Sequence, residues 1–409
     1  MEAAPSSERK KIRFTRKEWQ LLLILAAIQF TSLLDFVIMM PLAPMLRSQL
    51  SLNPNQFGYV VASYGITAFI GSIIASSWLD RMSRKTALLV LYGGFLLATA
   101  WCGLAESFEM LLTARSVAGL FGGVVGSAIM AIIGDHFQDS RRGTAIGLVM
   151  SSFALASIAG VPLGLLIAEN AGYRAPFLVI AGGAALIWIF AAFVMPPMRE
   201  HLQHPDAKSR IIDLVRVPRY YWAYLFSLTL TFGSFMVIPF IADYATKNIG
   251  TKETHLKYVY LVAGCVTLIT TNLIGRLSDH FGKLVVFRVV CFGSVIFSLI
   301  FTHLGQSSLG MVFLVTSGFM VFTSGRMVPG SALTTNMVKP QIRAGFMSLV
   351  TALQYAGMGI ASILGGLIIR DSSGGKLLGY GTMGLLAAAS MMISILIAGQ
   401  LRQYPTTER

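Results

Sequence analysis

The chain has 409 residues, of which 55% are hydrophobic and 12% are charged, and its mean hydropathy is +0.69. Soluble globular proteins carry about 25% charged residues, so this composition excludes a soluble class and indicates an integral membrane protein. The net charge of +14 does not indicate nucleic-acid binding, because the basic residues fall in short connections between apolar runs.

Cysteine and histidine give no sign of a metal or a disulfide framework. Cys102, Cys265 and Cys291 all lie in apolar segments, and their odd number and irregular spacing match neither kind of site. The six histidines lie mostly in polar connections, and no pair has the spacing of metal ligands. We therefore expect no metal and no cofactor.

The chain begins with a basic segment that includes "SERKKIRFTRKEW", ahead of an apolar run too long for a signal peptide. A membrane helix needs about 20 apolar residues, and twelve runs meet this length. Their approximate bounds are 19–46, 57–79, 86–105, 110–134, 143–168, 175–195, 221–245, 257–278, 284–304, 309–336, 343–369 and 378–401. The sequence thus predicts an all-α membrane protein with two six-helix bundles.

The predicted organisation follows from the longest polar connection and from the basic residues. The units are a basic N-terminus (1–18), a first bundle (19–196), a linker (197–219), a second bundle (220–401) and a tail (402–409). With the N-terminus inside, inner segments hold 23 of the 32 Lys and Arg residues and outer loops hold seven. This bias predicts a multi-pass protein of the inner (plasma) membrane with both termini in the cytoplasm.

The first span contains an isolated acid, Asp35, in "TSLLDFVIMMPLAPML". A charge at the centre of a bilayer costs roughly 2.5–3.5 kcal/mol on insertion scales, so such a residue is usually functional. Because withdrawal from water disfavours the ionised carboxyl, we expect Asp35 to bind and release protons. The alternative is that Asp35 is a structural partner of a buried donor such as Arg115.

Two connections and two spans carry sequence motifs. "SSWLDRMSRK" connects spans two and three, and its second copy, "GRLSDHFGK", follows span eight. Span four carries "LLTARSVAGLFGGVVGS" with Arg115, and span five carries "ASIAGVPLG" with Gly160, Pro162 and Gly164. Arg115 lies about 9 Å inside the outer boundary, so a snorkelling arginine is an alternative to a buried one.

The two halves are similar at an offset near 200 residues. "LDFVIMMP" in span one matches "GSFMVIPF" in span seven, and Asp80 matches Asp279. Such a duplication is typical of transporters whose halves rock around a central site. Arg326 lies mid-span in the second half without a nearby acid, and it requires water, a carboxylate, carbonyls or an anionic ligand. Asn272, Gln354 and Tyr355 are candidate polar neighbours in a cavity shared with Asp35 and Arg326.

With these motifs the chain resembles the major facilitator superfamily, in particular its twelve-span drug:proton antiporter and arabinose-efflux-permease-like branch. The resemblance covers essentially the whole chain. It departs from the family at Ser76 and Ser83, which replace glycines, at His280, which replaces an arginine, and at Val161, which interrupts a Gly-Pro pair.

The resemblance implies a conformational latch on the inner side. Its candidate residues are Asp80, Arg81, Arg84, Lys85, Asp135 and Asp279. Asp80 would face the positive end of the helix dipole near 341–345, and Arg84 would pair with Asp135. The alternative is that these charges only set the topology. The resemblance further implies proton coupling through Asp35 and Arg115, and antiport through the span-five motif.

The function expected is proton-coupled export of a small organic compound, such as a drug or metabolite, by a monomer in the lipid bilayer. A symporter or uniporter that imports a nutrient is the alternative, because the fold does not fix direction or substrate. An integral-membrane enzyme is disfavoured, because no catalytic pairing has suitable spacing. A non-transporting sensor is disfavoured, because the loops leave no room for an output domain.

Overall fold

The computed structural model describes residues 14–78, 81–199, 214–339 and 342–401. These residues are almost entirely helical, apart from one short hairpin formed by β1 (Arg370–Asp371) and β2 (Leu377–Leu378). Twelve helical segments in them are long and apolar enough to cross a membrane. The predicted all-α fold with twelve membrane helices is confirmed.

The N-terminal half contains six of these spans, one of which is made of two α-helices joined by a π-helix, η2. Its elements are α1 (Arg16–Ile38), α2 (Ala43–Gln49), α3 (Pro54–Trp78), α4 (Arg84–Leu104), α5 (Phe108–His136), α6 (Asp139–Leu155), η2 (Ala156–Gly160), α7 (Val161–Ala171) and α8 (Arg174–Val194).

The C-terminal half contains the other six, and two of its spans are likewise built from several helical pieces. Its elements are η4 (Pro218–Tyr220), α10 (Tyr221–Phe235), η5 (Ile238–Phe240), α11 (Ile241–Tyr244), η6 (Ala245–Ile249), α12 (Glu253–Phe281), α13 (Lys283–Thr302), α14 (Leu309–Gly325), α15 (Met327–Thr335), α16 (Arg343–Ile368) and α17 (Tyr380–Ala398).

Equivalent helices begin in the same way in the two halves. Ser107 caps α5 by accepting a hydrogen bond from the amide of Met110, and Ser308 caps α14 by accepting one from Met311. A side-chain oxygen at this position satisfies one of the amides that the first turn leaves unpaired. The internal repeat seen in the sequence therefore extends to the local signals that start the helices.

The first span is divided within the run predicted over 19–46. Helix α1 ends at Ile38, and α2 begins at Ala43 with Pro44 in its first turn. Proline has no amide hydrogen and its ring clashes with the preceding turn, so it ends helices and begins new ones. Span seven is broken at the matching place, where η5 contains Pro239.

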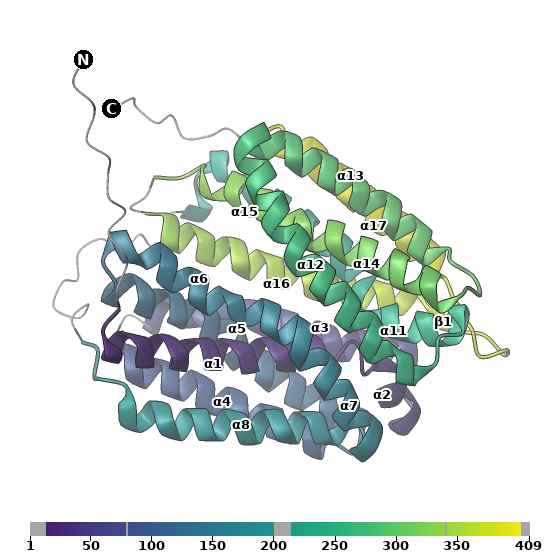
Figure 1. The fold of residues 1–409 in the computed structure, drawn as a ribbon, viewed down its shortest axis with the longest axis horizontal. Coiled ribbons are helices and arrows are strands. Elements are labelled where there is room, and N and C mark those ends of the chain that lie inside the picture. Colours follow the sequence, from purple (N-terminus) through teal and green to yellow (C-terminus); the bar gives the residue numbers. More distant parts are fainter. Residues whose placement is uncertain (1–13, 79–80, 200–213, 340–341, 402–409) are drawn as a thin grey trace.

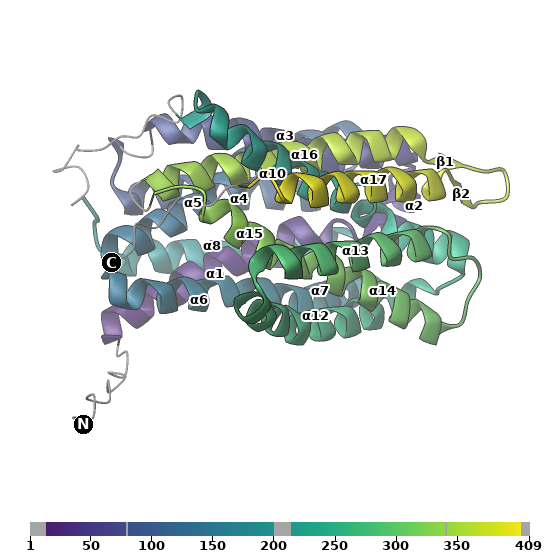
Figure 2. The same cartoon turned by 90° about the horizontal axis from the view of Figure 1, so that it is seen from above.

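The two halves lie side by side with α3 next to α16 (Figures 1 and 2). We call the end with α2, α11 and the β1–β2 hairpin the hairpin end, and the end where α1 begins and α17 finishes the terminal end. Glycines allow α3 and α16 to approach closely: a Cβ on Gly58 would lie 2.7 Å from the Ser362 carbonyl oxygen, and one on Gly65 would lie 2.8 Å from that of Tyr355.

The apolar core connects the halves at the hairpin end. The largest buried cluster runs from α1 and α2 into α10, α11 and α17, and it includes the ring contact of Phe57 with Phe240 at 5.8 Å. A second cluster is confined to the N-terminal half. The ribbons of α6 and α12 diverge toward the terminal end in Figure 1. The halves are thus joined tightly at the hairpin end.

Candidate substrate and proton site

The isolated acid of the first span forms an ion pair inside the N-terminal half. Arg115 of α5 donates from Nη1 to Asp35 Oδ2 on α1 at 2.8 Å, and both residues are buried, at 1% and 0% exposure. The second carboxylate oxygen, Oδ1, receives no hydrogen bond from a described residue. One oxygen of Asp35 is therefore held by a cation, and the Thr99 hydroxyl of α4 also lies beside the carboxyl.

An aromatic cluster connects this ion pair to the C-terminal half. The guanidinium of Arg115 lies over the Tyr64 ring at 4.7 Å, within the range of a cation–π contact. Phe36, the residue after Asp35, packs on Tyr64 at 5.1 Å and on Phe235 of α10 at 6.0 Å. Tyr355 packs against the same cluster from α16. A ligand that separates the halves here would meet aromatic rings beside the Asp35–Arg115 pair.

The span-five motif supports the helix that carries Asp35. A Cβ on Gly160 would lie 2.7 Å from Leu34 Cδ1, and one on Gly164 would lie 2.7 Å from Ile38 Cδ1. Pro162 follows the π-helix η2, which interrupts the span at this point. The two glycines therefore let α7 and η2 lie directly against α1, on both sides of Asp35 in the sequence.

The candidate latch residues are partly assembled. Arg84 Nε donates to Asp135 Oδ2 at 2.8 Å, and Lys85 Nζ donates to the Met195 carbonyl at 2.7 Å. Both contacts lie within the N-terminal half. Arg81 and Asp279 are exposed. Asp80 lies outside the described residues.

Arg326 is placed inside the C-terminal half rather than between the halves. It is fully buried at the junction of α14 and α15, and its Nη2 donates to the Ser234 hydroxyl at 2.6 Å and to the Leu230 carbonyl at 3.0 Å. Ser234 is the position that matches Asp35 in the repeat. The Leu230 carbonyl and the Ser234 hydroxyl of α10 thus accept hydrogen bonds from the guanidinium, for which we had considered an anionic ligand.

The remaining candidates do not converge on one place. Tyr355 joins the aromatic cluster, and Gln354 beside it is half-buried. Asn272 is exposed on α12 and donates to the Leu268 carbonyl of its own helix at 3.2 Å. Within the described part of the chain, Arg326 forms its hydrogen bonds with other residues than these three. Of the predicted cavity residues Asn272, Gln354, Tyr355 and Arg326, Tyr355 therefore lies in the aromatic cluster beside Asp35.

Sequence reasoning missed a group of charges at the hairpin end, which we call the hairpin-end clamp: Arg47, Asp243, Lys247 and Asp371. Arg47 of the N-terminal half forms ion pairs with Asp243 of α11 and, at 2.6 Å, with Asp371 of β1. Lys247 lies 3.1 Å from Asp371 and 3.6 Å from Asp243. Arg47 and Asp243 are both buried, at 5% and 0% exposure.

A second ion pair between the halves joins Lys257 of α12 to Glu169 of α7. Every ion pair between two described residues of different halves lies at the hairpin end. Arg47 was counted only as a basic residue of an outer loop, Asp371 was not considered, and Asp243 stands near the end of its predicted span. The proximity of α2 to α11 was the missing information, and spacing along the chain does not reveal it.

Among residues 14–78, 81–199, 214–339 and 342–401, no group of three His, Cys, Asp or Glu side chains is arranged to hold a metal ion. The side chains at the Asp35 site include one carboxyl, one guanidinium, the Thr99 hydroxyl, the Cys102 thiol and a set of aromatic rings.

The chain is similar to known proteins in sequence and in structure. The sequence model of the Major Facilitator Superfamily matches residues 25–325. The chain is 25% identical over 344 residues to the "Uncharacterized MFS-type transporter YceJ" of Bacillus subtilis, covering 83% of this chain and 86% of that protein. It is 25% identical over 287 residues to "Multidrug resistance protein 1" of the same organism, covering 69% and 74%.

A solved structure has the same fold. The bacterial homolog of the human lysosomal transporter Spinster, in its inward-facing and unoccupied conformation, superimposes with a TM-score of 0.73. The alignment covers 96% of this chain and all of that chain, at 16% sequence identity.

Proposed function

Because this chain belongs to the Major Facilitator Superfamily, and is accordingly a membrane transporter rather than an enzyme, we propose that it exports a small organic compound in exchange for protons. Asp35 carries the proton, and the compound binds beside it between the two halves. The protein works as a monomer in the plasma membrane with both termini in the cytoplasm, as the distribution of lysine and arginine favours.

The single observation that supports proton coupling is the buried Asp35–Arg115 pair. Protonation of Asp35 at Oδ1 removes the negative charge that compensates Arg115. The arginine keeps its own proton, so the attraction between α1 and α5 weakens when the carboxyl is neutral. Because an unpaired charge is costly in a buried site, the protonation state of Asp35 favours different arrangements of these two helices.

The substrate site is supported by the aromatic cluster. Phe36 and Tyr64 from one half and Phe235 from the other lie next to the ion pair. Rings of this kind bind organic compounds through apolar contact and stacking. A compound held there competes with the contacts that Arg115 makes to Asp35 and Tyr64. Substrate and proton therefore act on the same arginine, which is the physical requirement for exchange.

Alternating access needs one closed side at a time, and two sets of charges support it. The hairpin-end clamp closes the predicted outer side. The latch residues, including Arg84 and Asp135, close the predicted inner side when the halves move together there. The ion pairs that join the halves at the hairpin end favour a conformation that is closed on the predicted outer side.

Transport in liposomes tests the proposal. Purified protein is reconstituted in liposomes with an acidic lumen in alkaline buffer, and uptake is followed for fluorescent organic dyes of positive, zero and negative charge. Antiport predicts uptake of at least one dye with the acidic lumen and none when the gradient is reversed. Asp35→Asn should abolish this uptake, whereas Glu106→Gln, which removes an exposed acid of a surface pair, should not.

Two results would contradict the proposal. Uptake driven by the reversed gradient would identify a symporter. Gradient-driven accumulation by a folded Asp35→Asn protein would show that the proton is carried by another group.

A further inference from the structure

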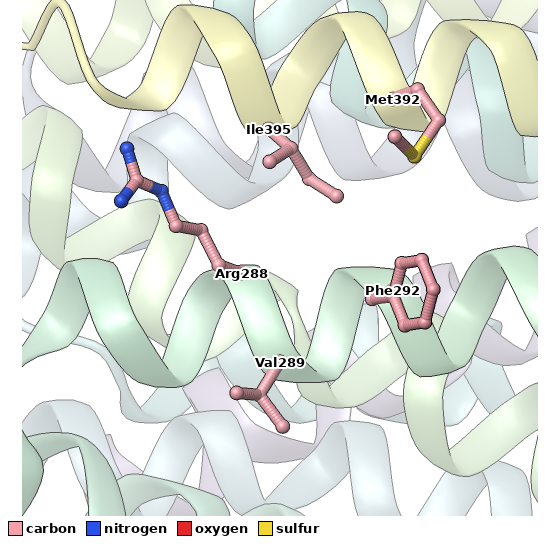
Figure 3. A pocket seen from close by; sticks show the side chains of 5 residues that line it. All are labelled: Arg288, Val289, Phe292, Met392 and Ile395. Carbon is pink, nitrogen blue, oxygen red and sulfur yellow. The ribbon is translucent and has the colours of Figure 1, made fainter.

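A groove lies on the outer surface of the C-terminal half, away from the interface between the halves. It runs between α13 and α17, which pack side by side along one edge of the molecule (Figure 1). Its volume is about 370 Å³, and its lining residues are Arg288, Val289 and Phe292 of α13 with Met392 and Ile395 of α17. Arg288, Phe292, Met392 and Ile395 point into the space between the two helices (Figure 3).

Arg288 is the charged residue of this lining. It stands five residues after the first residue of α13, about 7.5 Å along the helix axis from the terminal end. Its Nη2 lies 3.0 Å from the place that a Cβ on Gly399 would occupy, so the guanidinium reaches the end of α17. Arg288 is exposed, and no ion pair or hydrogen bond joins it to another described residue.

The rest of the groove is apolar and faces outward. Val289 and Phe292 are 65% and 54% exposed, and Met392 is 41% exposed. These residues belong to membrane spans, so hydrocarbon covers them in the bilayer. An arginine at the edge of such a surface lies at the depth where phosphate groups of lipids begin.

We propose that this groove binds one anionic phospholipid from the leaflet at the terminal end. Arg288 holds the phosphate, for which the planar guanidinium offers two parallel donors. One acyl chain lies between Phe292 and Ile395. An engineered cavity of about 150 Å³ binds benzene, so the groove has room for part of a chain. Basic pockets between membrane helices at the cytoplasmic side bind lipid head groups in this way.

Charge selects an anionic lipid over a zwitterionic one. A choline or ethanolamine head group would bring a second positive charge to Arg288, and the groove lining includes no acid to receive it. A free phosphate ion would use the guanidinium but would leave the apolar part of the groove without a ligand. The proposal depends neither on proton coupling nor on the direction of transport.

Fluorescence quenching tests the site directly. Phe292→Trp places an indole in the groove, in a protein whose five native tryptophans, none of which lines the groove, are changed to phenylalanine. The protein is reconstituted in phosphatidylcholine bilayers that contain a minor fraction of phosphatidylglycerol, and either lipid is brominated on its acyl chains. At equal mole fraction, brominated phosphatidylglycerol should be enriched about fivefold over brominated phosphatidylcholine at the indole, the factor expected for one arginine beside anionic lipid.

Matched variants identify the arginine as the cause. Arg288→Gln should abolish the enrichment, whereas Arg276→Gln, which removes another exposed arginine near the terminal end of α12, should preserve it. Inorganic phosphate should not displace the lipid. Equal quenching by the two lipids in the parent protein, or an unchanged enrichment in Arg288→Gln, would overturn the proposal, and displacement by inorganic phosphate would reassign the site to a free anion.

Discussion

Removing Arg47 should open the hairpin end. In Arg47→Gln the buried carboxylate of Asp243 loses its closest cation, and breaking a buried ion pair by removing one partner costs about 3–5 kcal/mol. Lys247 lies 3.6 Å from the same carboxylate and compensates part of the loss, so we expect the lower value, about 3 kcal/mol. The cost falls on the closed form alone, because water reaches Asp243 once the halves separate. The equilibrium should shift about 100-fold toward the open form.

Spin-label distances across the hairpin end measure this shift. Gln49→Cys in the N-terminal half and Lys252→Cys in the C-terminal half provide the label sites, in a protein whose three native cysteines are changed to alanine. The Arg47→Gln distribution should gain a longer distance. Arg174→Gln is the matched control, because it removes an arginine of the same side whose pair with Glu106 is exposed and lies within one half.

A double variant isolates the buried charge as the cause. Arg47→Gln combined with Asp243→Asn leaves no unpaired carboxylate at that position, so the shift should be smaller than in Arg47→Gln alone. If the single variant keeps the parental distance distribution, or if Arg174→Gln opens the hairpin end equally, the clamp does not hold the halves together and the reasoning is refuted.

Three further predictions concern the other buried contacts. Arg115→Gln leaves Asp35 without its cation and should destabilise the protein by about 3 kcal/mol; in thermal unfolding this deficit should shrink as the pH is lowered, because a protonated Asp35 needs no partner. Arg326→Gln should lower stability by about 1.5–3 kcal/mol, the value of a hydrogen bond from a charged donor, without changing dye affinity; weaker affinity at unchanged stability would instead make Arg326 a ligand contact. Gly58→Val places a side chain against the Ser362 carbonyl and should disfavour the closed hairpin end by about 1–3 kcal/mol, measured with the same spin labels.

The number of membrane helices and the helical fold could be predicted from the sequence for a physical reason. A helix in lipid must satisfy its own backbone hydrogen bonds, so length and hydropathy identify each span without reference to its neighbours. The repeat and the family motifs follow from the same one-dimensional information. For that reason the fold and the family were predicted, whereas the residues at which the first span divides became known only from the structure.

The ion-pair and hydrogen-bond partners of the buried charges could not be predicted in the same way. Asp35 and Arg115 were each recognised as unusual, but the sequence left open whether they meet, because tilt and rotation of a helix depend on its neighbours. Arg326 was expected near a cavity, whereas its donors face Ser234 and Leu230 on α10. Asp243 escaped notice because its partner Arg47 lies 196 residues away in the chain.

The π-helix in span five changes which residues of that span lie on the same face. Residues in an α-helix advance by about 100° each, and a π-turn inserts an additional residue into the regular repeat. The π-helix Ala156–Gly160 separates α6 from α7. The helical repeat of α7 is therefore out of phase with that of α6. A single helical wheel drawn through 139–171 assigns one of these segments to the wrong side. A cysteine-accessibility scan along this span should display two periodic patterns with a phase jump between Ala156 and Gly160.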